Sequence, residues 1–491
     1  MGRAPLGNIL KYIISALLAA VTGYLMVSRG LAVAGVAIGI PLLLGFFVIF
    51  FRWPKTGVYF VLIMSFILPI LGRYLPSGIP FGLTVDIMLV FTYIVLFLKH
   101  WKKVDFSLAA NEVMLLMTIW MAYIILQIVN PEAYSFAAWF YSMRGVALYQ
   151  FLLIGLCFIL FTDRKDWYQF FNIWLGMSVL AILWAMKQKV FGVDSYEQRW
   201  LDDGAAVTHV LFGKLRIFSY YFDAGTFGAA MGQISIMSFI LALGPWSMGR
   251  RVFYVVLGLF SFYALMLSGT RGALAVPAIG GILYLIMTRN FRMLTVGGAI
   301  LLSGFVFLKY TTIGNANYDI NRLRTALDPN DASLNTRLRN RARLTEYLRD
   351  KPFGGGMGTV GSWGQRFSPG TWLANFEPDG LYTRIRAETG LIGRIFYVGM
   401  WVFILVRGVI FMWRFPDMER RNISMAILAG YAGILVANYG NSVLTQFPVS
   451  ITTFIAVVFV YNMRYWNEAG HFELPDKPTP RLGRKPDDLP E

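Results

Sequence analysis

The chain has 491 residues, of which 57% are hydrophobic, 16% aromatic and only 14% charged, and its mean hydropathy is +0.56. A soluble protein of this length has about a quarter of its residues charged, so a soluble globule, a disordered chain and a disulfide-stapled secreted scaffold are excluded. The net charge of +17 is explained by the Lys and Arg that cytoplasmic loops of membrane proteins carry, and no nucleic-acid partner is expected. One cysteine and three widely spaced histidines show no metal-ligand spacing, so we expect no structural metal.

Fourteen apolar runs approach the roughly 20 residues that a membrane-spanning helix needs. They lie at about 9–27, 31–51, 57–72, 82–98, 112–128, 144–161, 168–188, 224–244, 252–268, 272–287, 292–308, 393–411, 423–440 and 449–463. The first is long and lacks a small-residue cleavage site, so we interpret it as a span and not as a signal peptide. The sequence predicts an all-α polytopic membrane protein with about 12–14 transmembrane helices.

Basic residues recur at every second connection between these runs. They lie at 52–55, 99–103, 164–165, 250–251, 289–292 and 414–421. The positive-inside rule assigns such connections to the cytoplasm, so both termini are expected there. Residues 1–308 would then hold the first eleven spans, 309–392 a large outward loop with short helices, 393–463 the last spans, and 464–491 a disordered cytoplasmic tail.

Three outward connections, at 129–143, 189–223 and 309–392, are too long to be turns. The last has 13 Lys and Arg against 8 acids between Lys309 and Arg394, and a loop of this length without structure is rare unless it is functional. Its segment DASLNTRLRNRARLTEYLRDKP predicts a helix, with Arg339 and Arg343 on a solvated face. The opposite, apolar stripe would contain Leu334, Leu338, Ala342, Thr345 and Leu348.

The glycines of KPFGGGMGTVGSW follow this helix. Their spacing matches a dinucleotide fingerprint, but the strand and helix that this motif requires are missing. Two interpretations remain open: a turn whose N–H groups face an anion, or a loop packed closely against a helix.

Several arginines lie beside apolar runs on the predicted outer side. Arg271 stands in LMLSGTRGALAVP, a break so short that its side chain must contact both flanking spans, and Arg216 stands in KLRIFSYYFDAGTFG with Asp223 nearby. Arg144 begins a span, and we expect its side chain to reach the membrane interface by snorkelling. Asp86, within a span, would form either a polar contact between helices or part of a relay.

The segment EPDGLYTRIRAETG brings a further ionisable cluster to the start of a span. Asp379 precedes an amphipathic stretch with Arg384, Arg386 and Glu388. Charged groups at this position are costly and indicate a functional site, and arginine suits bidentate capture of phosphate. The arginines together predict a phosphate or diphosphate ligand at the outer boundary, and a lipid-linked diphosphate fits best because its tail can remain in the bilayer.

In order and topology, residues 210–440 resemble the O-antigen ligase/polymerase superfamily of bacterial membrane glycosyltransferases. The resemblance rests on RIFSYYFDAGTFG, LSGTRGALAVP, RARLTEYLRDKPFGGGMG and DGLYTRIRAETGLIG. It implies a GT-C-like, metal-independent, inverting enzyme of the bacterial inner membrane that needs no cofactor, because the diphosphate-lipid is already an activated leaving group. Such an enzyme transfers a glycan from an undecaprenyl-diphosphate carrier to an acceptor hydroxyl.

The resemblance also implies roles for individual residues. Arg216 and Arg271 would bind the diphosphate and stabilise the leaving group, with Arg384 or Arg386 assisting. Ligases of this family begin the loop motif with a His-Asn pair whose His is the proposed base, whereas this chain has Asp379-Gly380. A carboxylate can accept the same proton, so Asp379 is the predicted base. The departure favours a polymerase of O-antigen or exopolysaccharide repeat units.

The alternatives are a ligase that transfers the glycan to lipid A core, a protein O-oligosaccharyltransferase, and a polysaccharide flippase or transporter. Transporters typically contain repeated halves around midplane charges, and no convincing repeat appears here. The expected partners are the lipid-linked glycan, a glycan, lipid or protein acceptor, and the bilayer. The enzyme would act either alone or with a chain-length regulator.

Overall fold

A computed structural model describes residues 44–75, 81–102, 104–211, 213–315 and 332–466, with a few isolated residues outside these ranges. Within them, regular structure is helical except for one antiparallel pair of short strands, β1 (Val210–Leu211) and β2 (Lys214–Leu215). Nine helical segments of the described chain are long and apolar enough to cross a membrane. The predicted class, an all-α polytopic membrane protein, is confirmed.

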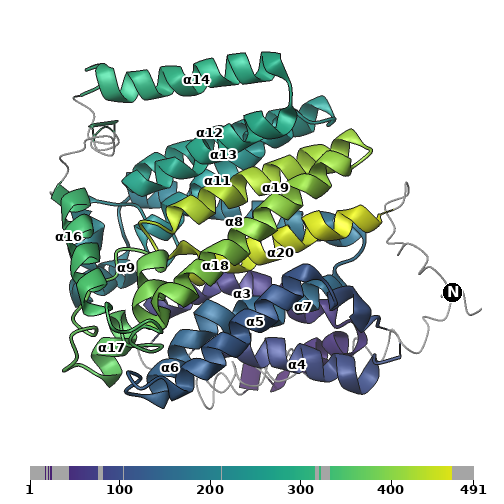
Figure 1. Cartoon of the computed structure of the whole chain (residues 1–491). Helices are drawn as coiled ribbons and strands as arrows, with labels where there is room; N and C mark the ends of the chain where they lie inside the picture. The colour runs from purple at the N-terminus through teal and green to yellow at the C-terminus, as the bar shows by residue number, and fades with distance from the viewer. Residues whose placement is uncertain are drawn as a thin grey trace, which may run out of the picture.

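The helices form one bundle, with the shorter elements mainly at one end (Figure 1). The long helices are α3 (Lys55–Tyr74), α4 (Leu83–Lys99), α5 (Glu112–Leu126), α7 (Tyr149–Leu160), α8 (Arg164–Val190), α11 (Ala224–Ala242), α12 (Met248–Leu267), α13 (Ala275–Thr288), α14 (Phe291–Tyr310), α18 (Leu381–Arg414), α19 (Met418–Ala437) and α20 (Val449–Asn462). The shorter ones are α6 (Phe136–Met143), α9 (Ser195–Trp200), α10 (Ala206–His209), α16 (Ala332–Tyr347) and α17 (Gly361–Phe367), with the π-helical turns η3 (Arg144–Leu148) and η4 (Leu201–Ala205) and the 3-10 turns η1 (Phe106–Ala109), η2 (Gln127–Val129), η5 (Arg271–Leu274), η7 (Val443–Thr445) and η8 (Met463–Tyr465).

Twelve of the fourteen predicted runs coincide with these helices. The run at 9–27, most of the run at 31–51, and the predicted tail beyond residue 466 lie outside the described residues. The run at 144–161 begins earlier than predicted, because α6, η3 and α7 join into one apolar segment, Phe136–Leu160.

Small residues allow the central helices to pack closely. α11 contacts α12, α13 and α19, and a Cβ on its Gly232 would lie 2.9 Å from the Leu265 side chain. On α19, a Cβ on Gly433 would lie 2.5 Å from the carbonyl oxygen of Val276. Every residue of α20 is buried. Because lipid tails compete for apolar contacts, such close backbone approach is a main source of helix association in membranes.

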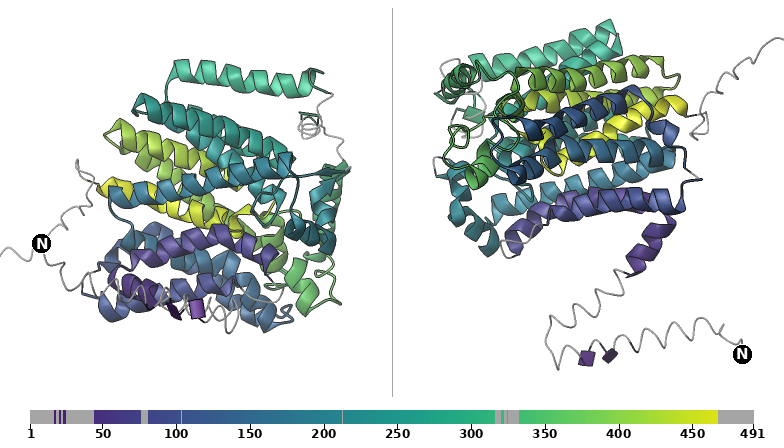
Figure 2. Two further views of the ribbon diagram at one scale, coloured as in Figure 1. Left: turned by 180° about the vertical axis from the view of Figure 1, so that it is seen from behind. Right: turned by 60° about the horizontal axis from the view of Figure 1, so that its bottom comes forward.

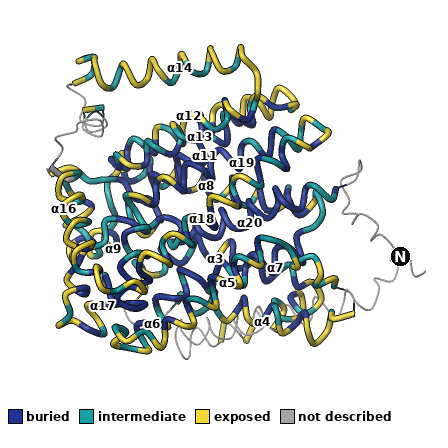
Figure 3. Tube along the Cα trace, in the orientation of Figure 1, coloured by how far each residue is buried: buried dark blue, intermediate teal, exposed yellow. Residues whose placement is uncertain are grey.

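The outer helices instead expose large apolar side chains. None of the residues of α14 is buried, and α14 lies beside α13 at the edge of the bundle (Figures 1 and 2). Figure 3 shows exposed residues along α12 and α14. The side chains of Phe253 and Phe260 on α12 are 46% and 51% exposed. An apolar surface of this kind suits contact with lipid.

Three connecting segments gather at one end of the bundle, on the left in Figure 1, which we call the loop end. These segments are 191–223, 332–380 and 438–448. The predicted helix of the large loop is confirmed as α16, but the predicted apolar stripe is wrong. Leu344 and Leu348 are buried in a small core that also contains Ala387 of α18, whereas Leu338 is 50% exposed, because this core covers only the last turns of α16.

Glycines of the large loop pack against a break in α18. The break lies at Gly390, whose φ is 72° and ψ is −169°. Gly355 and Gly356 donate their N–H groups to the carbonyl oxygens of Ala387 and Glu388 at 2.8 and 3.0 Å. A Cβ on Gly390 would lie only 1.9 Å from the carbonyl oxygen of Pro352. The glycine run is therefore a loop packed against a helix.

We predict that Gly390→Ala destabilises the protein by about 3 kcal/mol or more, because the new Cβ clashes with backbone in a left-handed conformation. Gly399→Ala in the same helix is the control, since a Cβ there would have no neighbour within 4 Å. Thermal unfolding of the purified protein in detergent measures both. Equal melting temperatures for the two variants would contradict the packing described.

Candidate active site

An open cavity of about 300 Å³ lies at the loop end. It is formed by the end of α10, the start of α11, the residues before α18, and the turn between α19 and α20. Its lining consists of Thr208, His209, Arg216, Asp223, Ala224, Gly225, Pro378, Asp379, Gly380, Asn441, Ser442 and Gln446. The cavity brings together Arg216 and Asp379, two of the residues that the sequence singles out.

Arg216 is held in a fixed orientation against the turn between α12 and α13. It directly follows β2, and its backbone N–H donates to the carbonyl oxygen of His209 at 2.8 Å. Its Nε donates to Ser268 O at 3.2 Å, its Nη1 to Thr208 O at 2.8 Å, and its Nη2 to the Thr270 hydroxyl at 2.7 Å. Three of its five N–H groups therefore bind neutral oxygens, which orient the guanidinium group.

Arg271 comes directly after this turn, as the first residue of η5. Gly269, with φ of 55°, forms the turn, and the Thr270 hydroxyl lies 3.0 Å from Ala224 O at the start of α11. Arg271 does not line the cavity itself. Arg216 and Arg271 are thus linked through Ser268–Thr270, although they come from different connections.

Asp379 lines the cavity, and one of its two carboxylate oxygens is buried. Its Oδ1 lies 3.7 Å from Nε of Arg337 on α16, whereas its Oδ2 has no hydrogen-bond partner among the described residues. The position is fixed by its neighbour Gly380, because a Cβ there would lie 2.5 Å from Tyr439 O. A carboxylate that lines a cavity can accept a hydrogen bond, and then a proton, from a hydroxyl group.

Neutral polar side chains complete the cavity, and the sequence interpretation missed them. Asn441 approaches the start of α11, where a Cβ on Gly225 would lie 2.8 Å from its Nδ2. Gln446 contacts the hydroxyl of Thr226, which also lies 2.8 Å from the carboxylate of the N-cap residue Asp223. The polar sequence NYGNSVLTQ, which lies between two apolar runs, could have indicated that Asn441 and Gln446 belong to the site.

His209 joins the cavity wall to the first turn of α11. Its ring is buried, its Nδ1 lies 2.9 Å from Ala205 O, and its Nε2 accepts the N–H of Ala224 at 3.2 Å. These contacts assign the neutral ring with its proton on Nδ1. Burial lowers the pKa of His209 below its usual 6.5, and the charges of Arg216 and Arg73 add to this shift.

We predict that the protein loses stability as the pH falls below about 6.5, partly through His209. The pKa of His209 is lower in the folded state than in the unfolded state. At a pH between these two pKa values, the unfolded chain binds a proton at His209 and the folded protein does not, which favours unfolding. Melting temperatures between pH 7.5 and 5.5 test this. His209→Gln should reduce the loss. A pH profile of this variant parallel to that of the wild type would contradict the assignment.

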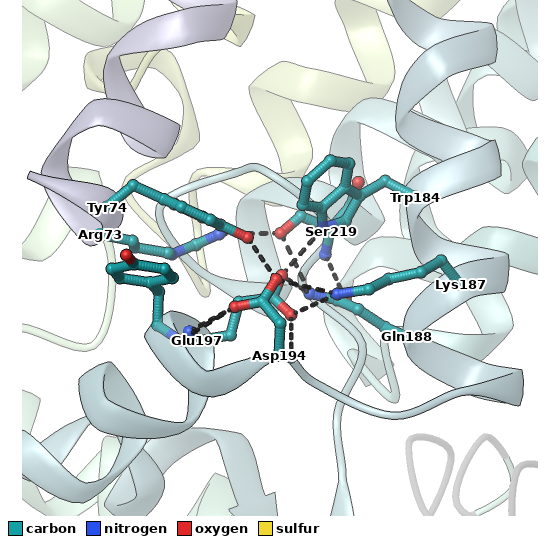
Figure 4. A network of polar contacts seen from close by, with 9 residues as sticks. Arg73, Tyr74, Trp184, Lys187, Gln188, Asp194, Glu197 and Ser219 are labelled. Carbon is teal, nitrogen blue, oxygen red and sulfur yellow. Dashed lines mark hydrogen bonds and ion pairs between the residues drawn. The ribbon is translucent and has the colours of Figure 1, made fainter. Parts of the chain in front are cut away.

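A polar network positions the segment that leads to the cavity (Figure 4). The carboxylate of the fully buried Glu197 lies 3.0 Å from Lys187 Nζ and accepts from Gln188 at 2.7 Å and from Trp184 at 2.8 Å. Gln188 in turn accepts the N–H of Ser219 at 2.8 Å. The network therefore anchors the chain four residues before Asp223 to helices α8 and α9.

The same network reaches α3 through Asp194. Tyr74 donates to its carboxylate, and Lys187 lies 3.0 Å away. Desolvation raises the pKa of Asp194, but hydrogen bonds from Tyr74, the Glu197 backbone and Lys187 outweigh this and lower the pKa to about 2. The carboxylate is therefore ionised at neutral pH and holds α3, α8 and α9 together.

Arg384 and Arg386 lie outside this cavity, on two other faces of α18. The Nε of Arg384 is 3.2 Å from the buried Glu388 carboxylate, and its Nη2 donates to Ser142 at 2.8 Å. Arg386 lines a separate, smaller cavity with Arg341 and Arg394. The structure therefore does not gather all the predicted arginines around one point.

Two further predicted residues, Asp86 and Arg144, form an ion pair with each other. Arg144 is buried, so the prediction that it snorkels to the interface was wrong. A carboxylate on α4, distant in sequence, supplies the counter-charge that allows burial. Asp86 is thus a contact between helices, as one of its two interpretations proposed.

The fold and the cavity define a polytopic membrane protein with a polar, arginine-containing site at one end of its bundle. Residues 254–398 match the family model described as O-Antigen ligase. The match includes Arg271, Asp379, Arg384 and Arg386 but not Arg216. It confirms the resemblance to the O-antigen ligase/polymerase superfamily and supports a multi-pass membrane enzyme that transfers glycans, of the ligase or polymerase kind. No curated protein matches the chain.

Proposed function

We propose that this protein is a glycosyltransferase of the bacterial inner membrane that polymerises lipid-linked repeat units. It transfers a glycan from an undecaprenyl-diphosphate carrier to an acceptor hydroxyl. One observation carries the proposal: Arg216 and Asp379, from distant parts of the chain, line one open cavity, and Arg216 is bound to the turn that leads to Arg271.

The orientation in the membrane is part of the proposal, with the loop end outside and both termini in the cytoplasm. Basic residues that the positive-inside rule assigns to the cytoplasm lie at helix ends away from the loop end. Lys55 pairs with Asp166 at 2.7 Å, and Arg164 pairs with Glu419. These contacts join the beginnings of α3, α8 and α19, which supports this orientation.

The donor diphosphate would bind to Arg216 and Arg271. A guanidinium group remains charged at any physiological pH and binds phosphate oxygens through two parallel hydrogen bonds. The three hydrogen bonds that fix Arg216 prepare it for this contact, so little reorganisation is needed when charge develops on the leaving group. Arg384 is already paired with Glu388, so we assign it to positioning α18.

Asp379 would act as the general base. Its carboxylate removes the proton from the acceptor hydroxyl while the hydroxyl oxygen forms a bond to the anomeric carbon of the donor sugar. The bond from this carbon to the diphosphate oxygen breaks, and its electron pair leaves with the diphosphate. A single displacement inverts the anomeric carbon. The arginines supply the positive charge that the leaving group requires, so no step is assigned to a metal or a cofactor.

We predict that Asp379→Asn and Arg216→Ala each lower the rate of glycan transfer by about 100-fold or more, because they remove the base and a leaving-group contact. The assay uses purified protein, undecaprenyl-diphosphate-linked repeat units and gel separation of the products. Glu377→Gln and Arg349→Ala are the controls, since both residues are exposed. Wild-type rates in either site variant would refute the assigned role.

The same assay distinguishes polymerase from ligase. With lipid-linked repeat units alone, we expect a ladder of longer lipid-linked glycans, because Asp379 replaces the His of the ligase motif. Transfer that appears only after lipid A core or an acceptor protein is added would make the protein a ligase or a protein glycosyltransferase. Absence of transfer in both cases would favour a flippase, which a lipid translocation assay in vesicles would detect.

A further inference from the structure

Three arginines surround a second, much smaller cavity, of about 30 Å³, on the first turns of α18. Arg341 comes from α16, whereas Arg386 and Arg394 lie on either side of the break at Gly390. Leu344, Tyr382, Thr383 and Tyr439 complete the lining. The volume excludes a sugar ring, so only a small group can enter.

The described residues that line this cavity include no acidic one. Arg341 donates to Tyr439 O at 3.0 Å and its guanidinium lies 3.7 Å from the centre of the Tyr439 ring. Neither Arg386 nor Arg394 has a hydrogen bond or an ion pair within the part of the chain that the structure describes. Two other arginines of α18 do have acidic partners, since Arg384 pairs with Glu388 and Arg407 pairs with Glu112. Three like charges around one small cavity repel one another, so an anion would stabilise this arrangement.

The cluster lies where the apolar outer surface of α18 begins. Leu391, Ile392 and Ile395 are 52%, 49% and 64% exposed, and they surround Arg394 in sequence. A ligand that binds here can place an anionic group among the arginines and an apolar chain along these residues. Phosphate attached to a lipid combines both properties, and arginine is well suited to bind it.

We propose that Arg341, Arg386 and Arg394 bind the phosphate of a lipid, at a site separate from the cavity of Arg216 and Asp379. The two cavities are lined by neighbouring parts of one segment: Asp379 and Gly380 line the first, and Tyr382 and Thr383 line the second. The carbonyl oxygen of Tyr439 accepts from Arg341 and also packs against Gly380.

Two lipids can supply this chemistry: an anionic phospholipid of the bilayer, or a second undecaprenyl-diphosphate-linked glycan. The second assignment rests on the proposed function. A polymerase must hold two lipid-linked substrates at once, and the second phosphate site would then hold the carrier of the acceptor. Binding itself does not depend on the enzyme being a polymerase.

The test compares two double variants by native mass spectrometry in a neutral detergent. Arg386→Gln with Arg394→Gln removes two charges from the cluster, whereas Arg339→Gln with Arg343→Gln removes two charges from the exposed face of α16. The probes are undecaprenyl diphosphate, phosphatidylglycerol and, as a neutral comparison, phosphatidylcholine. Melting temperatures verify that both variants are folded. If the Gln pair is unstable, Arg386→Lys with Arg394→Lys retains the charge but removes the bidentate contacts of arginine, and it should bind the anionic lipids more weakly than the wild type does.

We expect the cluster variant to lose one bound anionic lipid, with affinity reduced at least tenfold, and the control to bind as the wild type does. Preference for undecaprenyl diphosphate identifies the carrier, and equal binding of phosphatidylglycerol identifies a bilayer lipid. Unchanged lipid binding in the cluster variant, or equal loss in both double variants, overturns the proposal.

The transfer assay then separates this proposal from the proposed function. If the site holds the acceptor carrier, the cluster variant should raise the KM for lipid-linked acceptor about tenfold while kcat changes little. If the wild-type protein shows no transfer but the cluster variant still loses the bound lipid, the second site is established and the polymerase is refuted. A KM equal to that of the wild type would exclude the acceptor carrier and leave the bilayer lipid.

Discussion

The candidate site depends on the close approach of one turn to two glycines. The turn between α19 and α20 contacts Gly380 through Tyr439 O and Gly225 through the side chain of Asn441. These contacts bring the starts of α18 and α11 to the same place, and with them Asp379 and Arg216. Larger side chains at either glycine would displace the turn and separate the two helix starts. The close fit of the turn between α19 and α20 against Gly380 and Gly225 therefore helps to form the cavity.

The sequence predicted the helices well, because apolar length and loop charge are local properties of the chain. It also predicted that Arg216 and Asp379 share one end of the bundle. It could not predict which arginines face which cavity, since helix rotation depends on neighbours that are distant in sequence. Two residues apart on a helix differ by about 200°, so Arg384 meets Glu388 while Arg386 faces Arg341. The sequence did not identify Asn441 as a site residue, because the prediction relied on charged residues beside apolar runs and Asn441 is uncharged.

The helical geometry of α18 is interrupted at Gly390. Backbone carbonyl groups left without donors are costly near lipid, where water cannot replace the missing partner. Here Gly355 and Gly356 supply donors to the two carbonyls before the break. The large loop is therefore part of the backbone hydrogen bonding of α18. These glycines lie between Leu348 and Val360, two residues of the small core that also contains Leu344 and Ala387.

The contrast between α11 and α14 has a consequence for how the chain tolerates substitution. α11 is enclosed by α12, α13 and α19, and its small residues leave no room for added atoms. α14 has no buried residue and lies beside α13 at the edge of the bundle. Its position is determined by the partition of an apolar cylinder into the bilayer, which depends on total hydrophobicity and not on shape. Apolar substitutions should therefore be tolerated more widely along α14 than along α11, except where α14 packs on α13, as at Gly297, whose added Cβ would lie 2.4 Å from the Leu285 side chain.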